Sequence, residues 1–287
     1  MSNERKKVNR KHKDRLFRLI FRDKKDLMQL YNAVNNTNYD NPEDFEVNTL
    51  EDVVYMGMKN DISFLIKDVL NLYEHQSTFS PNLPLRGLLY FADLYRKLIV
   101  HEQDIYSSRQ IPLPFPQFVV FYNGTQEEPE RQVLHLHEAF PEGMTAENAA
   151  LDCHAVIINI NIGHNQAIMQ KCRKLEEYAI FIGKIREYTE KKLTIEEAID
   201  KAVEDCIKEG ILEKILRENR EEVCSMLLKE YDEQAHIENE REIAKEEGQE
   251  RVNLLIRTLI EQNRNDEISR AVSDKDFQEG LFKEFDI

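Results

Sequence analysis

The clearest pattern in the chain is an alternation of apolar and polar residues that begins just after Asn60. Ile62, Phe64 and Ile66 are separated by single residues, and a second apolar run, Val69–Tyr73, follows after the link Lys67-Asp68. This period of two predicts two strands joined by a tight hairpin. A two-residue loop, or a four-residue loop with the same centre, pairs residues whose numbers add up to 135. A three-residue loop would give a different register.

Other stretches predict the rest of the fold. Strands are expected at 45–50, 118–122, 133–136 and 156–160, and the proline-rich stretch 111–116 is expected to be an extended lead-in outside the sheet. Helical periodicity predicts helices over 14–36 with a break near 22–25, from Pro84 to about His101, and over 168–185, 195–207, 211–216 and 223–228. The helix after Pro84 is expected to bury Leu85, Leu88, Leu89, Ala92, Tyr95 and Leu98 or Ile99. Thr194, with Glu197 three residues later, predicts a capping box at a helix start.

These elements predict a first part that combines strands and helices, followed by an all-helical C-terminal region. Residues 230–251 contain nine acidic and three basic residues and few apolar ones. We expect a solvated helical arm or linker there, because no heptad seam is present. Residues 252–287 regain an amphipathic pattern and predict a small C-terminal helical unit.

Composition limits the class of protein. The 287 residues allow one sizeable core plus an appendage or two small domains. No apolar run approaches the roughly 18 residues of a membrane span, and the N-terminus lacks a signal-peptide core, so we expect a cytoplasmic protein that does not enter membranes. The four cysteines are widely spaced and predict buried free thiols. The histidines lack the H-x-x-x-H ligand spacing and are expected to be surface or core residues.

Charge is distributed unevenly along the chain. The formal net charge is −15, yet residues 1–25 contain eleven Lys/Arg and three acidic residues, a local charge of +8 that leaves −23 for the remainder. An acidic body argues against general nucleic-acid binding, whereas a basic arm can follow phosphates. A solubilising terminus without such a role is an equally good interpretation of the arm.

The hairpin rule brings two carboxylates together. Asp61 and Glu74 have numbers that add up to 135, so they are expected to face each other with β-carbons about 4.5–5.5 Å apart. Like charges at that distance need neutralisation, and a hard cation such as Mg²⁺ favours one or two carboxylates with water and phosphate oxygens. Gln76 points to the same face. The alternative is a solvated pair on the wet face of an edge hairpin.

An ordered set of motifs resembles the PD-(D/E)XK nuclease fold and, within it, the Rpn family of recombination-promoting nucleases, also called putative transposases. The set comprises His12-Lys13-Asp14-Arg15-Leu16-Phe17-Arg18, Asp61, Glu74-His75-Gln76, Pro84-Leu85-Arg86, Tyr90, Phe121-Tyr122-Asn123-Gly124 and Glu230-Tyr231-Asp232. A lysine separates His12 from Asp14, where the family's opening motif has the two types adjacent. The resemblance spans nearly the whole chain, and its specificity lies in the order of the motifs.

The resemblance implies an α+β core of α/β/α type with a central mixed sheet. It also implies a Mg²⁺- or Mn²⁺-dependent DNA endonuclease. Asp61 and Glu74, with the carbonyl of His75, would hold the metal, and Gln76 would stand where the wider fold has a lysine, as is common in the Rpn family. Asp14, Arg86 and Tyr90 are possible accessory residues. Asp14 is equally suited to cap a helix, and Arg86 to form an ordinary ion pair. The implied partners are DNA and a second copy of the chain in a homodimer.

The charge pattern, the periodicity and the resemblance together suggest how the chain is divided. We expect a basic arm and helix start at 1–25, a nuclease-like domain at 14–165, a helical region at 166–231, the acidic arm or linker at 232–251 and the terminal unit at 252–287. The rival hypothesis is a catalytically weak or inactive scaffold, derived from a nuclease, that associates with DNA or protein.

Overall fold

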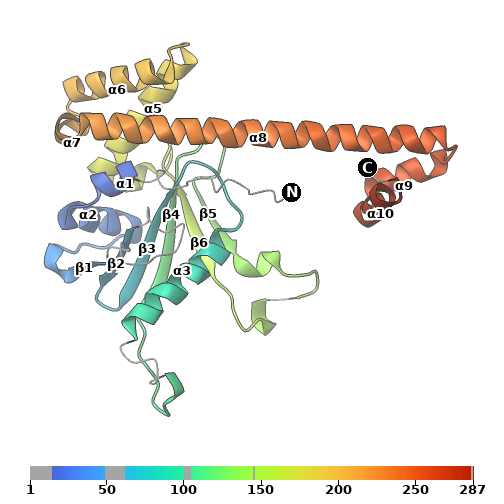
Figure 1. Ribbon diagram of the computed structural model, residues 1–287. Helices are drawn as coiled ribbons and strands as arrows, with labels where there is room; N and C mark the ends of the chain where they lie inside the picture. Colours follow the sequence, from blue (N-terminus) through green and yellow to red (C-terminus); the bar gives the residue numbers. More distant parts are fainter. Residues whose placement is uncertain (1–14, 49–61, 100–104, 145, 286) are drawn as a thin grey trace, which may run out of the picture. The chain divides into compact units, whose positions relative to one another are not determined.

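A computed structural model of the chain describes residues 15–48, 62–99, 105–144, 146–285 and 287 (Figure 1). The protein is α+β, with a six-stranded mixed sheet and a helical C-terminal region, as the sequence predicts. The chain forms two compact units, residues 1–230 and 231–287. The first unit contains the sheet and every predicted site residue.

The sheet has parallel strands at its centre and antiparallel strands at both sides. Its order is β1-β2-β3-β4-β6-β5. The strands are β1 (Phe45–Asn48), β2 (Ile62–Ile66), β3 (Val69–Gln76), β4 (Phe115–Tyr122), β5 (Arg131–His135) and β6 (His154–Asn159). β3, β4 and β6 run parallel, so their carboxyl ends meet at one edge of the sheet. Ligands of open α/β sheets usually bind at that edge.

The predicted hairpin register is confirmed. β2 and β3 pair from Ile62↔Tyr73 to Ile66↔Val69, and every pair adds up to 135. Lys67 turns the chain with φ = 51°, in the left-handed region, which the two-residue loop requires. The next pair in this register would be Asp61 and Glu74. Asp61 lies outside the described residues, so its pairing stays a prediction.

Helices cover both faces of the sheet. On one face, α3 (Leu83–Leu98) packs on even-numbered positions of β3 and β4, such as Leu72 and Val120, and on odd-numbered positions of β6, such as Ile157. On the other face, Phe17 of α1 (Arg15–Ile20) contacts Phe121 and Tyr178, the latter from α5 (Arg173–Glu190). α2 (Lys24–Asn35) lies on the same side, where Tyr31 contacts Phe64. The result is the three-layer arrangement that the sequence predicts.

The predicted buried stripe of α3 was wrong. Leu85 and Leu89 are 46% and 57% exposed, and Ala92 and Leu98 are also exposed. The buried residues are Leu83, Pro84, Gly87, Phe91 and Leu94. The apolar pattern missed this face because its central position is a glycine, which contributes no hydrophobic side chain. The ring of Phe118 occupies the space above it.

Substitution Gly87→Ala should therefore destabilise the first unit. A β-carbon at this position would lie 2.5 Å from Cδ1 of Phe118, so the ring or the helix must shift. We expect a loss of about 1–3 kcal/mol in the free energy of unfolding, measured by urea denaturation. Gly280→Ala is the matched control, since apart from the nearby backbone of α10 (Lys275–Phe285) itself nothing lies within 4 Å of an added β-carbon. That variant should be unchanged or stabilised by up to about 1 kcal/mol. Equal effects of both substitutions would contradict the packing argument.

β4 starts earlier than predicted. The sequence places 111–116 outside the sheet, but β4 begins at Phe115 and includes Pro116. The N–H of Phe115 donates to the carbonyl of Asp68, on the β3 side. Successive N–H groups alternate sides, so the nitrogen of Pro116 faces the β6 side, where pairing starts only at Val119. Proline is tolerated because no ladder hydrogen bond is required of it there.

The helices after the sheet follow the predicted periodicity. They are α4 (Gln166–Lys171), α5 (Arg173–Glu190), α6 (Ile195–Glu209), α7 (Glu213–Glu218) and α8 (Arg220–Glu261). The capping box of α6 is confirmed, because Thr194 and Glu197 each accept a hydrogen bond from the other's main chain. α8 has 42 residues, but neither it nor any other helix in the described ranges is apolar enough over a membrane-spanning length.

The four cysteines are free, as predicted, but only Cys172 and Cys206 are buried, whereas Cys153 and Cys224 are partly exposed. Burial raises the pKa of Cys172 to about 11 and that of Cys206 to about 12. Both side chains are therefore protonated thiols at neutral pH. They act as small apolar residues of the helical layer.

The second unit has its own small core. η6 (Asn265–Glu267), α9 (Ile268–Ser273) and α10 pack on the last turns of α8. The core consists of Leu255, Leu259, Ala271, Leu281 and Phe282. Arg251 donates two hydrogen bonds to the carbonyl of Ile287 and lies over the ring of Phe282, with 4.1 Å from Cζ to the ring centroid.

Candidate functional site

The predicted site residues gather at the carboxyl end of β3, on the face covered by α3. Glu74 and Gln76 follow Leu70 and Leu72 at even positions of β3, so they point towards α3. Arg86 and Tyr90 are four residues apart on α3 and share one side of the helix. One strand end and one helix start therefore build the site.

The centre of the site is a buried carboxylate. The side chain of Glu74 is 1% exposed, and its Oε1 accepts hydrogen bonds from Nε2 of Gln76 at 2.5 Å and from the guanidinium of Arg86. Arg86 is 35% exposed, and its Nε lies 3.4 Å from Oη of Tyr90. A buried carboxylate is tolerated when charged and polar donors hydrogen-bond to it. Because Arg86 reaches both the carboxylate and solvent, it can also contact an anion outside the sheet.

The structure brings together four of the six predicted residues. Glu74, Gln76, Arg86 and Tyr90 contact one another in this cluster. Asp61 and Asp14 lie outside the described residues, so their positions stay predictions. Of the interactions that the sequence left open for Arg86, the structure shows the ion pair with Glu74.

The donor set at this end of β3 suits a hard cation. Glu74 offers carboxylate oxygens, which Mg²⁺ and Mn²⁺ prefer, and Gln76 holds one of them in a fixed direction. A second carboxylate, for which Asp61 is the candidate, would complete the usual set of one or two acidic ligands. The guanidinium of Arg86 forms an ion pair with Glu74.

A second polar cluster lies on the opposite face of the sheet, and the sequence did not predict it. Nε2 of His75 lies 2.9 Å from Oη of Tyr178, which also accepts a hydrogen bond from Nδ2 of Asn123 at 3.0 Å. Arg186 donates to the carbonyl of Asn123 and to Oδ1 of Asn161. This network ties α5 to the carboxyl ends of β3, β4 and β6. No sequence signal could reveal it, because its members lie far apart in the chain; His75 and Tyr178, for example, are 103 residues apart.

A group of two histidines and an aspartate was also not predicted. His135 and His137 lie on either side of the end of β5, and Asp152 precedes β6. The prediction for the histidines relied on the H-x-x-x-H spacing of a helix. An H-x-H pair at a strand end, followed by an acidic residue before the partner strand, is the signal that would have found the group.

No protein-family model matches the chain, and neither the curated proteins nor the solved structures give a significant match. A function therefore has to be argued from the site geometry and from the motifs themselves.

Proposed function

We propose that the chain is a Mg²⁺- or Mn²⁺-dependent DNA endonuclease with a core of the PD-(D/E)XK type. The main support is the register of the β2–β3 hairpin. Glu74 comes directly after Tyr73, which is in the last described pair, and the same register extended by one position would pair Glu74 with Asp61. The carboxylate is buried beside an arginine that still reaches solvent. This combination is more consistent with a site that binds a cation and a phosphate than with a solvated pair of carboxylates at the surface.

Each residue has a distinct role in this proposal. Glu74 and Asp61 bind the metal, which when bound activates water and stabilises negative charge on the scissile phosphate. Gln76 holds the carboxylate of Glu74, and as a neutral amide it can orient water but cannot deprotonate it. Arg86 is placed to bind a phosphate oxygen, with Tyr90 supporting the guanidinium.

DNA is the proposed substrate because of the charge distribution. The basic arm, residues 1–25, has a net charge of +8 on a chain of net charge −15. Such an arm contributes salt-dependent attraction to phosphates, whereas the acidic remainder limits non-specific binding.

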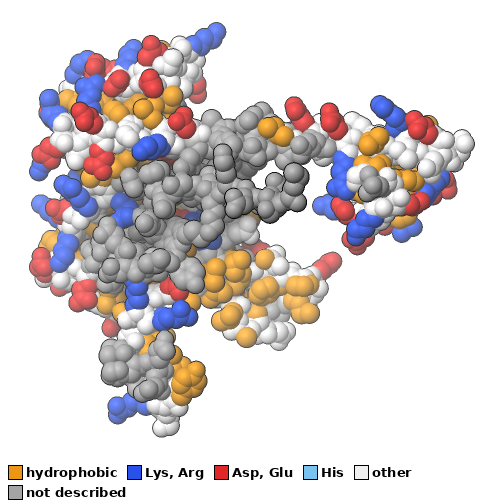
Figure 2. All heavy atoms as spheres, viewed as in Figure 1, with side chains coloured by type: hydrophobic (Ala, Val, Ile, Leu, Met, Phe, Trp, Pro, Cys, Tyr) orange, Lys and Arg blue, Asp and Glu red, His pale blue; other side chains and the backbone are white. Residues whose placement is uncertain are grey.

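We propose a homodimer as the assembled form. Figure 2 shows hydrophobic side chains gathered on the segment between β5 and β6, where Met144 and Leu151 are 67% and 60% exposed. Val133 of β5, the last strand of the sheet, is 41% exposed. An apolar surface beside a sheet edge is typical of a protein interface.

Plasmid nicking tests the proposed activity. The full chain should nick supercoiled plasmid with Mg²⁺ or Mn²⁺ and not with EDTA. Asp61→Asn should reduce the rate at least about 100-fold, because metal binding contributes several kcal/mol to transition-state stabilisation. Asp68→Asn is the matched control, since Asp68 lies exposed in the hairpin turn and should leave the rate unchanged. Nicking that survives Asp61→Asn would overturn the site assignment.

The second candidate is a non-catalytic scaffold for DNA or protein association. The ion pair between Arg86 and Glu74 favours it, because a carboxylate already neutralised by a guanidinium needs no cation. Absence of nicking with either metal, together with retained DNA binding in a mobility-shift assay, would support the scaffold.

A further inference from the structure

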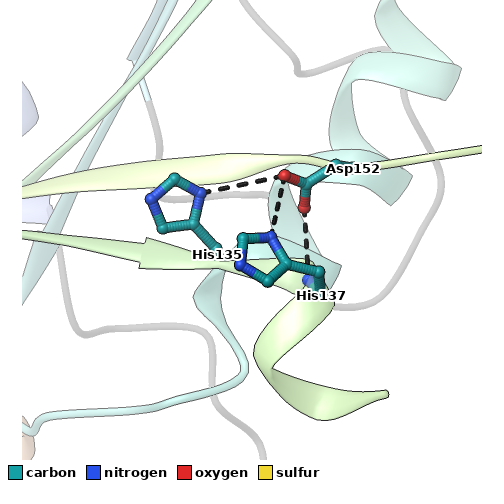
Figure 3. A group of neighbouring side chains, drawn as sticks. All are labelled: His135, His137 and Asp152. Atoms are coloured by element: carbon teal, nitrogen blue, oxygen red, sulfur yellow. Dashed lines mark hydrogen bonds and ion pairs between the residues drawn. The ribbon is translucent and has the colours of Figure 1, made fainter. Parts of the chain in front are cut away.

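His135, His137 and Asp152 form a second group of ligand-type side chains, at the end of the β5–β6 ladder (Figure 3). His135 pairs with His154 in the antiparallel ladder, and the N–H of Leu136 donates to the carbonyl of Cys153 just beyond it. His137 follows in η4 (Leu136–Ala139). Backbone pairing between these two chain segments therefore fixes the backbone positions from which the three side chains project.

The carboxylate of Asp152 is oriented by the main chain. Its Oδ1 accepts hydrogen bonds from the N–H groups of His137 and Cys153, at 3.2 and 3.0 Å. Its Oδ2 faces the two imidazoles, 3.0 Å from Nδ1 of His137 and 3.8 Å from Nδ1 of His135. Figure 3 shows the contacts of Asp152 with His135 and His137 as dashed lines on the two carboxylate oxygens. Hydrogen bonds that orient a ligating carboxylate are a usual feature of metal sites.

One ligand atom lacks a hydrogen bond within the described part of the chain. Nδ1 of His135 is buried and has no hydrogen-bond partner among the described residues, and Oδ2 of Asp152 is too far away to accept one. A buried polar atom without a partner costs free energy that a bound ion would recover. The missing hydrogen bond at Nδ1 of His135 therefore supports a bound ion independently of the grouping of three ligand-type residues.

The spacing fits direct coordination of one ion. Ligand bonds of about 2.0–2.2 Å in a tetrahedral zinc site put neighbouring ligand atoms about 3.4 Å apart. The two distances from Asp152, 3.0 and 3.8 Å, lie on either side of this value, and the three ligand atoms lie within 4.8 Å of one another. The side chains are 31–37% exposed, which leaves room for water at a fourth position.

We propose that His135, His137 and Asp152 bind one zinc ion or a chemically similar first-row divalent metal. Two imidazoles and a carboxylate favour zinc over Mg²⁺, which prefers oxygen ligands alone. This site is distinct from the Glu74 cluster. Glu74 is in line with Ile157 across the sheet, so His154 lies three residues towards the amino end of β6, about 10 Å along the strand.

The two sites also lie on different faces. Leu134 packs with the core beneath α3, so its neighbour His135 points to the other face, whereas Glu74 faces α3. The metal inferred here would cross-link the start of the 136–153 segment to its end. It would stabilise this connection between β5 and β6, whether or not the chain cleaves DNA.

Zinc titration of the full chain tests the proposal. After EDTA treatment and removal of the chelator, calorimetry with ZnCl₂ should show one equivalent bound at this site, and zinc should raise the melting temperature. Asp152→Asn and His137→Gln should each weaken this binding at least about 100-fold, since loss of outer-shell partners alone costs 10–100-fold. His164→Ala is the matched control, because His164 follows the opposite end of β6 and should not change binding.

Binding of Co²⁺ to the unchanged chain reports the ligand types directly, so this test does not depend on whether the variants fold. Co²⁺ bound to the unchanged chain should give the visible absorption of a four- or five-coordinate nitrogen and oxygen site, without a thiolate charge-transfer band. Circular dichroism of the zinc-free variants should match that of the zinc-free parent. The proposal is overturned if zinc does not bind, if binding is unchanged in both Asp152→Asn and His137→Gln, or if the cobalt spectrum shows thiolate ligation.

Discussion

Substitution Glu74→Gln is expected to reduce metal-dependent nicking of plasmid at least about 100-fold, because the carboxylate is the proposed metal ligand and metal binding is worth several kcal/mol in the transition state. The amide has nearly the same shape and keeps an oxygen that can accept from Gln76 and Arg86, which both donate to Oε1. The substitution leaves Arg86 without a charged partner, but Arg86 is 35% exposed and stays in contact with solvent. The free energy of unfolding should therefore fall by about 1–2 kcal/mol, less than after loss of the guanidinium. Nicking rates and urea denaturation of the same preparation measure both quantities.

Glu176→Gln is the control for this variant. Glu176 is an exposed carboxylate in the first turn of α5, so its substitution removes the same charge without touching the site. It should leave the nicking rate unchanged. A Glu74→Gln variant that nicks plasmid at the parent rate would remove Glu74 from the mechanism and would favour the scaffold hypothesis.

Substitution Arg86→Met should have the largest effect on stability. It removes the guanidinium from a carboxylate that is 1% exposed, while the thioether still fills part of the space of the arginine stem. Breaking a buried ion pair on one side costs about 3–5 kcal/mol, and we expect about 3 kcal/mol here because Arg86 is itself 35% exposed. Urea denaturation monitored by circular dichroism gives the change in the free energy of unfolding.

The double variant Glu74→Gln/Arg86→Met separates the charge effect from packing. Without the carboxylate, loss of the guanidinium leaves no buried charge behind, so the double variant should be more stable than Arg86→Met alone. Replacing both partners of a buried pair is often nearly neutral. If the double variant is as unstable as Arg86→Met, the destabilisation comes from lost packing on α3 and not from the ion pair.

The local periodicities of the sequence determined most of the helices and strands and the register of the β2–β3 hairpin. Alternation around Lys67-Asp68 predicted the pairing of β2 with β3, because side chains in a strand have a period of two and a short loop fixes the partners. The same register selected Glu74 as a candidate metal ligand from its position in the chain alone. Thr194 and Glu197 predicted a helix start for a similarly local reason, since the two residues satisfy each other's main chain.

Interactions between distant segments were decided only by the tertiary structure. The buried side of α3 depends on Phe118, which fills the space above Gly87. A pattern of apolar residues does not reveal a buried position that has no side chain. The place of Pro116 in β4 depends on where β6 begins to pair. The group of His135, His137 and Asp152 exists because two strands bring residues 15 or more positions apart within 3.8 Å of one carboxylate oxygen.

The sequence by itself thus determined the residue types and spacings that local backbone geometry can use: the hairpin, the caps and the acidic and amide side chains on one face of β3. The tertiary structure decided which partners those side chains meet. Arg86 reaches Glu74 because α3 crosses the strand that carries it, and this placement follows from packing over the whole sheet. Burial of a carboxylate beside a guanidinium is a property of that packing, since neither residue specifies its partner through local geometry.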